Sequence, residues 1–142
     1  MRYLCDSNVF VALVSSGHVH HIAATKWFDG LDEGDTAEFC RMTQSSFLRL
    51  LTTDKIMRPF TLTNSQARDV LRTTFTDIRI SFCDEPDRLE DRWFRNAAAN
   101  RASPNLWMDA YLAAFAEIAG MPFVTFDKAF RQFSSLNLVV LD

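Results

Sequence analysis

The stretch Leu106 to Gly120, LWMDAYLAAFAEIAG, decides how the rest of the chain must fold. Apolar residues fall on every side of the helix that it predicts, and a helix that is apolar all round is buried. Gly120 followed by Pro122 is a typical helix stop. Glu117, in the last turn, is expected to reach solvent. Asp109, in the first turn, is surrounded by apolar residues, and a buried carboxylate must be paired, protonated or bound to a cation.

The length and composition of the chain fit one domain that spans residues 1–142. With 142 residues, 48% of them hydrophobic and 23% charged, the chain can bury a core and has little scope for disorder. The net charge of −3 argues against broad, non-specific binding to nucleic acid, although it allows a local basic groove. The thirteen Phe residues also suit a homodimer interface.

The cysteines and the N-terminal segment indicate the compartment. Cys5, Cys40 and Cys83 are odd in number and far apart, so they predict buried free thiols in a reducing compartment rather than a disulfide framework or a metal knuckle. The apolar run Val9 to Val14 is too short to span a membrane, and no signal-type cleavage site follows it. We therefore expect a cytoplasmic protein without a membrane segment.

Short apolar strands alternate with helices along the whole chain. Strands are expected at 2–5, 36–40, 78–83, 122–126 and 137–141. Helices are expected at 8–15, capped by Ser7, and at 22–31, 44–53, 64–75, 86–98 and 106–120, with a short helix near 129–133 and a loop at 54–60. This alternation predicts an α/β fold with a parallel, doubly wound sheet. In such sheets, ligands bind outside the carboxyl ends of the strands.

Three aspartates are expected to meet at that edge of the sheet. Asp6 follows the first strand, Asp127 follows the strand at 122–126, and Asp109 lies at the start of a helix that feeds a parallel strand. Without a cation these carboxylates would repel one another and raise each other's pKa values. Oxygen ligands of this kind suit Mg²⁺ or Mn²⁺ rather than zinc. Such ions can activate a water for phosphodiester cleavage.

Four stretches carry a resemblance to a known family. They are LCDSNVFVAL at 4–13, TQSSFLRLLT at 43–52, LWMDAYLAAFA at 106–116 and FVTFDKAF at 123–130. In this order and spacing the chain resembles the PIN-domain ribonucleases, and within them the VapC-like toxins of type II toxin–antitoxin pairs. The resemblance implies a three-layer α/β/α sandwich with a mainly parallel central sheet, and a toxin that cleaves RNA with Mg²⁺ or Mn²⁺. It also implies a cognate antitoxin protein as partner.

The resemblance assigns roles to individual residues. It implies that Asp6, Asp109 and Asp127 are the catalytic and metal-binding residues, and that Ser7 and Thr125 support the site. Gln44 departs from the pattern, because much of the family carries a Glu at this position of the helix. Gln keeps a carbonyl oxygen but loses a negative charge, so weaker metal affinity or a single ion is expected. Glu38 remains open as a substitute, although a strand position is not the natural place for it.

Simpler interpretations compete for the same residues. Asp6 and Asp127 each precede a helix that they could cap, and Asp109 could pair with an arginine, for which the candidates are Arg41, Arg49 and Arg101. A phospho-accepting receiver domain is an alternative function, with its acceptor in the run Cys83-Asp84-Glu85. A second alternative is a non-catalytic binding module with a PIN fold and a weakened site, an idea that only Gln44 supports.

Three further groups have structural interpretations. The histidines between the first two helices are expected to be exposed loop residues rather than metal ligands, namely His18, His20 and His21. The aromatic residues near the buried helix are expected to be core or interface anchors, namely Trp93, Phe94 and Trp107. A basic groove for RNA is a hypothesis that rests on Arg41, Arg49, Lys55 and Arg58.

Overall fold

Five parallel strands form a single sheet in the computed structural model, which describes residues 1–142. The strands are β1 (Arg2–Cys5), β2 (Thr36–Phe39), β3 (Ile80–Phe82), β4 (Phe123–Thr125) and β5 (Leu138–Val140). Their spatial order is β3-β2-β1-β4-β5, and all four neighbouring pairs are parallel. The predicted parallel α/β sheet is therefore confirmed. β1 is the central strand, so whatever follows it lies in the middle of the carboxyl edge.

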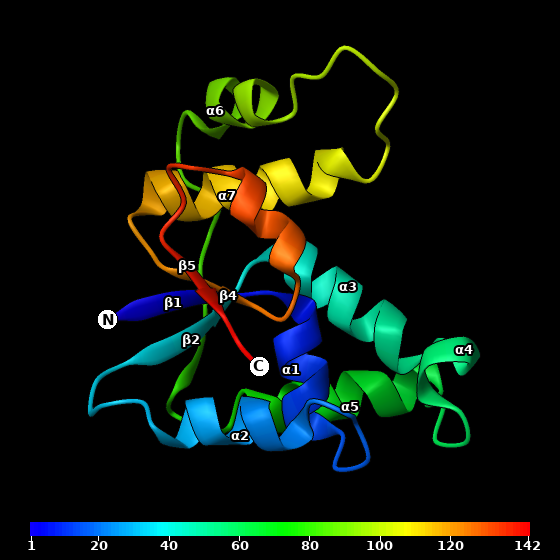
Figure 1. The fold of residues 1–142 in the computed structure, drawn as a ribbon. Coiled ribbons are helices and arrows are strands. Elements are labelled where there is room, and N and C mark those ends of the chain that lie inside the picture. Colours follow the sequence, from blue (N-terminus) through cyan, green and yellow to red (C-terminus); the bar gives the residue numbers. More distant parts are fainter.

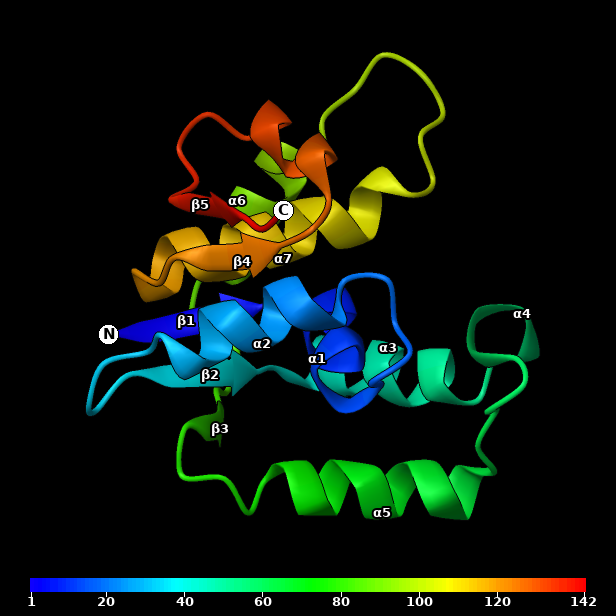
Figure 2. The same ribbon diagram turned by 60° about the horizontal axis from the view of Figure 1, so that its bottom comes forward.

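Helices cover both faces of this sheet (Figure 1, Figure 2). One face carries α6 (Leu89–Asn96), α7 (Leu106–Ala119) and the short 3-10 helix η1 (Lys128–Gln132). The opposite side carries α1 (Ser7–Val14), α2 (His21–Asp29), α3 (Arg41–Leu51) and α5 (Asn64–Thr74), with the one-turn α4 (Asp54–Met57) after α3. These three layers are the expected α/β/α sandwich. None of the helices combines the length and the apolar character that crossing a membrane requires.

The strands build two cores because successive side chains point to opposite faces of the sheet. Leu4 and Phe123 are in register and both belong to the core under α7. Cys5 and Val124 are the next pair and belong to the core under α1 and α3. All four side chains are fully buried. Each short central strand thus contributes to both cores, which is why these segments are apolar without alternation.

Helix α7 is buried as its sequence predicts. Ala113, Ala114 and Ala116 have no exposed surface, and such small side chains let a helix lie close to a sheet. The helix ends at Gly120, whose φ of 67° is left-handed, a conformation that glycine adopts without strain. Asn105 takes the N-cap position, but its side chain makes no capping hydrogen bond.

The expectation that Glu117 reaches solvent is wrong. Its side chain is only 6% exposed and accepts a hydrogen bond of 2.5 Å from Arg92 Nη1. Asn96 Nδ2 donates a second hydrogen bond of 3.1 Å to the same carboxylate. Both partners come from α6, which packs along α7. A helix that lies over the last turn of α7 therefore replaces water as the partner of this carboxylate.

Three local expectations also change. The predicted loop at 54–60 contains α4, and Arg58 pairs with Asp54 there. The helix expected from Pro86 begins only at Leu89, because Arg88 takes a left-handed φ of 64° that interrupts the helix. Ser7 is not the cap of α1, since it is the first helical residue and the N-cap position belongs to Asp6.

Candidate functional site

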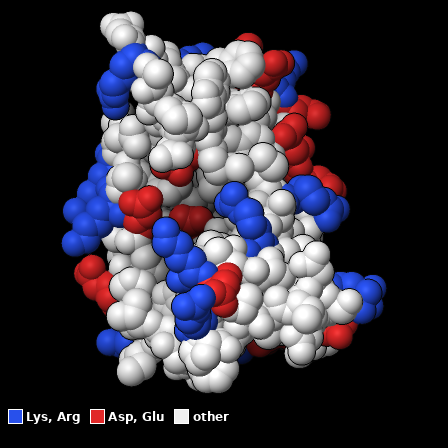
Figure 3. Space-filling model, turned by 90° about the vertical axis from the view of Figure 1, so that its right-hand side faces the viewer, with Lys and Arg blue, Asp and Glu red and all other residues white.

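The three aspartates lie where the carboxyl ends of β1 and β4 meet the start of α7. Asp6 directly follows β1, and its backbone N–H donates a 2.8 Å hydrogen bond to the carbonyl of Val124 in β4. Asp127 lies two residues beyond the end of β4, and Asp109 lies in the first turn of α7. Figure 3 shows acidic side chains inside a hollow near the middle of one face, with basic side chains around it.

The hydroxyl of Thr125 organises the surroundings of Asp6. It donates a 2.7 Å hydrogen bond to Asp6 Oδ2 and accepts one of 3.0 Å from the backbone N–H of Asp127. It also accepts a 3.4 Å hydrogen bond from Asn8 Nδ2. A hydroxyl has one hydrogen to donate and two lone pairs, so this set fills its capacity and fixes its direction. Ser7 Oγ lies 3.5 Å from Asp6 Oδ1, a weaker contact.

The site is electrostatically uncompensated within the chain. Burial raises the pKa of Asp6, and the charge of Asp127 adds to this, while the hydrogen bond from Thr125 opposes it. Burial raises the pKa of Asp109 to about 6, with further contributions from the charges of Asp127 and Asp6. None of the three forms a salt bridge with an Arg, Lys or His side chain. The arginine partner considered for Asp109 is therefore absent.

The oxygen donors suit a hard divalent cation, but they do not converge on one point. No group of three His, Cys, Asp or Glu side chains is arranged to hold a metal ion together. The exposed carboxylate of Asp127 instead accepts a 2.8 Å hydrogen bond from the backbone N–H of Ala129 and caps η1. Three like charges lower their repulsion by staying apart, and a cation of opposite charge removes that repulsion. The donor chemistry, oxygen without sulfur or imidazole, fits Mg²⁺ or Mn²⁺.

Asn8 is a member of this site that the sequence did not single out. Its Oδ1 atom is buried and has no hydrogen-bond partner, although its Nδ2 atom contacts Thr125. A buried carbonyl oxygen without a partner is uncommon, because its lost hydration costs about 1–3 kcal/mol. The available signal was its position two residues after Asp6, at the end of a strand that leads into a helix. Asn8 thus adjoins Thr125 and carries a carbonyl oxygen that no protein group occupies.

Gln44 is buried at the start of α3 and is already engaged. Its Oε1 atom accepts a 2.6 Å hydrogen bond from Arg41 Nη1, and the Arg41 guanidinium lies 4.8 Å from the ring centre of Phe82. Glu38 is not a substitute for a missing carboxylate. Its side chain is 1% exposed, and its oxygens accept hydrogen bonds from Arg2 and Thr36 in the middle of the sheet.

The other candidate groups take different places. His21 opens α2 and bonds with the carbonyl of Ala12, and the half-buried ring of His20 stacks on Phe126 at 4.3 Å, so these two are not free loop residues. Phe94 and Trp107 are about half exposed and are not core residues, with exposed fractions of 49% and 52%. Trp93 Nε1 donates to the carbonyl of Trp107 and joins α6 to α7.

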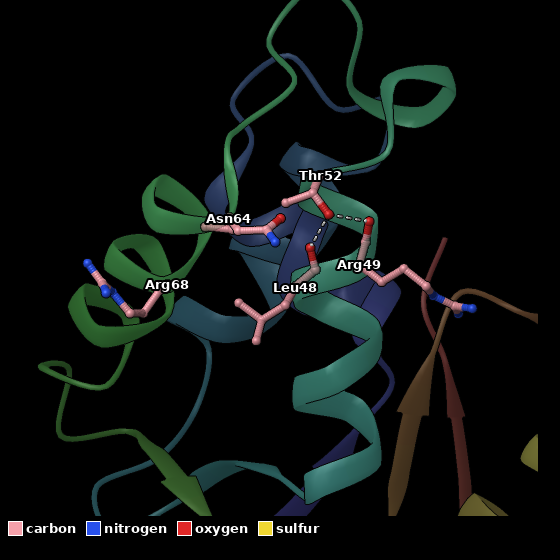
Figure 4. A pocket seen from close by; sticks show the side chains of 6 residues that line it. Leu48, Arg49, Thr52, Asn64 and Arg68 are labelled. Atoms are coloured by element: carbon pink, nitrogen blue, oxygen red, sulfur yellow. Dashed lines mark hydrogen bonds between the residues drawn. The ribbon is translucent and has the colours of Figure 1, made fainter.

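The arginines of the proposed basic groove have different surroundings. Arg41 contacts Gln44, but Arg58 pairs with Asp54. Arg49 lines a separate cavity of about 370 Å³ between α3 and α5, together with Arg68 and Asn64. Figure 4 shows that the two arginines point away from each other there, while Thr52 bonds to carbonyls of its own helix. This cavity therefore lacks converging polar groups.

The sheet order argues against a receiver domain. Asp84, the expected phospho-acceptor, follows β3, and β2 separates β3 from β1. An acceptor must lie beside the acidic pocket that follows the first strand, but Asp84 lies at the outer edge of the sheet. The phospho-acceptor alternative is therefore not favoured.

Comparisons with known proteins agree with this architecture. The PIN domain family matches residues 3–136. Ribonuclease VapC41 of Mycobacterium tuberculosis is 42% identical over 142 residues, which cover 97% of each chain. Ribonuclease VapC44 of the same organism is 32% identical over 130 residues, which cover 91% of this chain and 88% of that relative.

Solved structures show the same fold at low identity. VapBC2 from Rickettsia felis, bound to a DNA fragment from its promoter, superposes with a TM-score of 0.73 at 14% identity over all of both chains. The sarcin–ricin loop cleaving toxin VapC20 of Mycobacterium tuberculosis gives 0.68 at 14% identity, over 95% of this chain and 97% of that one. With the family match and the 42% identity, the chain belongs to the PIN-domain family, in the branch of the VapC ribonucleases.

Proposed function

We propose that this protein is a metal-dependent endoribonuclease and the toxin of a toxin–antitoxin pair. The observation that carries the proposal is the group of three aspartates, Asp6, Asp109 and Asp127. Their charges contribute to the raised pKa values of Asp6 and Asp109, and no cationic side chain balances them. The sequence identity of 42% and 32% with two VapC ribonucleases supports RNA as the substrate. The absence of a paired Cys or His site supports a hard cation over zinc.

Asp6, Asp109 and Asp127 would hold Mg²⁺ or Mn²⁺, which supplies a Lewis acid and an activated water for attack on an RNA phosphodiester. Thr125 holds the Asp6 carboxylate in one orientation through its hydrogen bond to Oδ2. Asp109 stands in the first turn of α7, and the residues that follow it, Ala110 to Ala116, are buried and anchor the helix. Asp127 must release the backbone N–H of Ala129 or share its second oxygen when it binds.

The partners follow from the same chemistry. An antitoxin that inhibits this site needs a basic group to balance the uncompensated carboxylates, and the VapBC complexes among the solved structures support such a partner. A homodimer is part of the proposal, because Phe94 and Trp107 leave apolar surface exposed beside the start of α7. We place the protein in the cytoplasm on account of its three free cysteines.

Substitution of the aspartates tests the mechanism. Asp6→Asn and Asp109→Asn are expected to lower the rate of Mg²⁺- or Mn²⁺-dependent RNA cleavage by at least about 100-fold, because each removes a charge that holds the metal. The measurement is cleavage of a labelled RNA with metal and with EDTA. Calorimetric titration with Mn²⁺ separates loss of binding from loss of chemistry.

Asp84→Asn is the matched control, because Asp84 also follows a strand but lies at the outer edge of the sheet. This variant should cleave RNA as the parent does. Cleavage by both site variants at the parental rate would refute the mechanism. Tight binding of Mn²⁺ and RNA without any cleavage by the parent would instead support a binding module with a weakened site, for which Gln44 is the one structural argument.

A further inference from the structure

Two of the three cysteines lie at the ends of neighbouring strands. The register of β2 and β3 pairs Phe39 with Phe82, and the backbone N–H of Cys83 donates a 2.7 Å hydrogen bond to the carbonyl of Phe39. Cys40 continues β2 in an extended conformation, with φ −113° and ψ 173°. Cys40 and Cys83 are therefore the next pair in register. Successive residues of a strand point to opposite faces of the sheet. Phe39 and Phe82 belong to the core under α1 and α3, so the thiols of Cys40 and Cys83 point to the other face, which α7 covers.

The packing agrees with this placement. Cys40 is 1% exposed and belongs to the core under α7, and Cys83 is half-buried and packs against that same core. The charge of Cys83 contributes to the raised pKa of Cys40, in addition to burial, which is the larger cause. Cys5 is different, because it points to the opposite core and has no cysteine beside it.

The spacing of the two residues suits a disulfide. Neighbouring strands lie about 4.8 Å apart, and disulfides join Cα atoms that are about 4.4–6.8 Å apart. We propose that Cys40 and Cys83 form a reversible disulfide through exchange with a low-molecular-weight disulfide such as oxidised glutathione. This site goes beyond the proposed nuclease function and does not depend on it.

The order of attack follows from exposure and charge. Cys83 is the accessible thiol, and the guanidinium of Arg2 is close enough for Cys83 to contribute to the raised pKa of Arg2. Cys83 attacks the glutathione disulfide and releases one reduced glutathione, which takes the proton. Cys40 then loses its proton, its thiolate attacks the Cys83 sulfur of the mixed disulfide, and the second glutathione leaves as a thiolate that takes up the proton. Two thiols are oxidised and one glutathione disulfide is reduced, so atoms and electrons balance.

The bond would tie the start of α3 to the end of β3. Cys40 is the N-cap of α3, and its carbonyl accepts a 3.0 Å hydrogen bond from Thr43 Oγ1. Arg41 follows it directly, lies over Phe82 and holds Gln44. The disulfide would therefore lie one residue from both members of the Arg41–Phe82 contact, and oxidation would restrain the turn of α3 that carries Gln44.

The test is native oxidation of the full chain with oxidised glutathione, followed by alkylation in denaturant and peptide mass spectrometry. The expected result is simultaneous loss of two thiols, a peptide pair linked through Cys40 and Cys83, a free Cys5, and full recovery of three thiols with dithiothreitol. Cys40→Ser should keep one glutathionyl group on Cys83, and Cys83→Ser should take up none, because Cys40 and Cys5 are buried.

Three results would overturn the proposal. They are a parent protein that does not react, one that keeps glutathione on Cys83 while Cys40 stays free, and one that forms only intermolecular disulfides. The parent protein carries the decisive measurement, so the conclusion does not depend on the folding of the variants. Oxidation of the denatured chain is the control. All three thiols are accessible there, so Cys5 should react as readily as Cys40 and Cys83, and the selective pairing should disappear.

Discussion

Burial of the Asp109 carboxyl raises its pKa from 3.8 to about 6, and the charges of Asp127 and Asp6 contribute further. The folded protein therefore holds this proton more tightly than the unfolded chain does. The contribution of Asp109 to the free energy of unfolding of the metal-free protein must then fall as the pH rises from 3.8 to about 6, and stay low above that range. A divalent cation at the site opposes this loss, because it replaces the proton as the balancing charge.

Asp109→Asn is expected to stabilise the metal-free protein at about pH 7, because it removes the unbalanced charge while it keeps the shape. The full shift corresponds to about 3 kcal/mol, but the side chain is partly exposed and solvent screens it, so we expect about 1 kcal/mol. Urea unfolding in EDTA measures the difference. At about pH 4 the parent carboxyl is largely protonated, and the two proteins should unfold at similar urea concentrations.

Thr125 offers a second prediction for a single residue. Thr125→Val removes the hydroxyl that donates to Asp6, which leaves that carboxylate less well held and raises its pKa further. Groups that orient metal ligands typically contribute about 10–100-fold to metal affinity, and we expect a loss of that order for Mn²⁺. The pH profile of cleavage should move to higher pH. Thr125→Ser keeps the hydroxyl and should retain both properties, so equal losses in the two variants would contradict this role.

At the scale of elements, one ion pair with a buried carboxylate, Arg92–Glu117, contributes to the contact between α6 and α7. Arg92→Ala leaves the Glu117 carboxylate, which is 6% exposed, with Asn96 as its only side-chain partner. Removal of one member of a buried pair is costly, and we expect a loss of about 2–3 kcal/mol in the free energy of unfolding. Urea unfolding at neutral pH provides the measurement.

The control for this pair is Arg68→Ala. Arg68 pairs with Asp69 on the surface of α5, with both side chains more than half exposed. Exposed pairs contribute about 0–1 kcal/mol, so this variant should unfold almost as the parent does. An Arg92→Ala protein as stable as the Arg68→Ala protein would mean that water hydrates Glu117 and that the helices are less tightly packed.

The elements themselves were largely predictable because their signals are local. The apolar runs at 2–5 and 122–126 and the all-round apolar helix at 106–120 require burial wherever they lie, and the structure places them as expected. The late start of α6 was not predictable from Pro86, because the left-handed φ of Arg88 depends on how the chain enters the layer above the sheet.

The site residues that follow the ends of strands were predictable from the sequence. Asp6 follows a strand that proved to be central, and Asp127 follows its neighbour β4. The hydrogen bond between Arg41 and Gln44 and the unpartnered oxygen of Asn8 had no such signal. Both depend on side-chain directions that tertiary packing sets, and the spacing of residues along the sequence does not contain them.

At the scale of the whole molecule, the two cores share the same strands. Leu4 and Cys5 are adjacent in β1, yet each belongs to a different core. Loss of one layer would expose one face of the whole sheet, so neither layer is expected to persist alone. We therefore predict one cooperative unfolding transition for the entire chain.

Tryptophan fluorescence can test this cooperativity. Trp27, in α2, packs against the core under α1 and α3, whereas Trp93 packs against the core under α7. In a Trp27→Phe variant the fluorescence reports the α7 side, and in a Trp93→Phe, Trp107→Phe variant it reports the α2 side. Within each variant, the urea midpoint from fluorescence should match the midpoint from circular dichroism. Separate midpoints would identify two independent units and contradict the prediction.

The central position of β1 also has a consequence for biosynthesis. A ribosome completes β1 and β2 early, but β4, the other neighbour of β1, begins only at Phe123. Asp6 is therefore synthesised long before Asp109 and Asp127, the other two carboxylates of the site. A nascent or prematurely terminated chain that stops before β4 lacks Asp127 and one side of the site. The strand order thus delays the complete group of three carboxylates until β4 and Asp127 have been made.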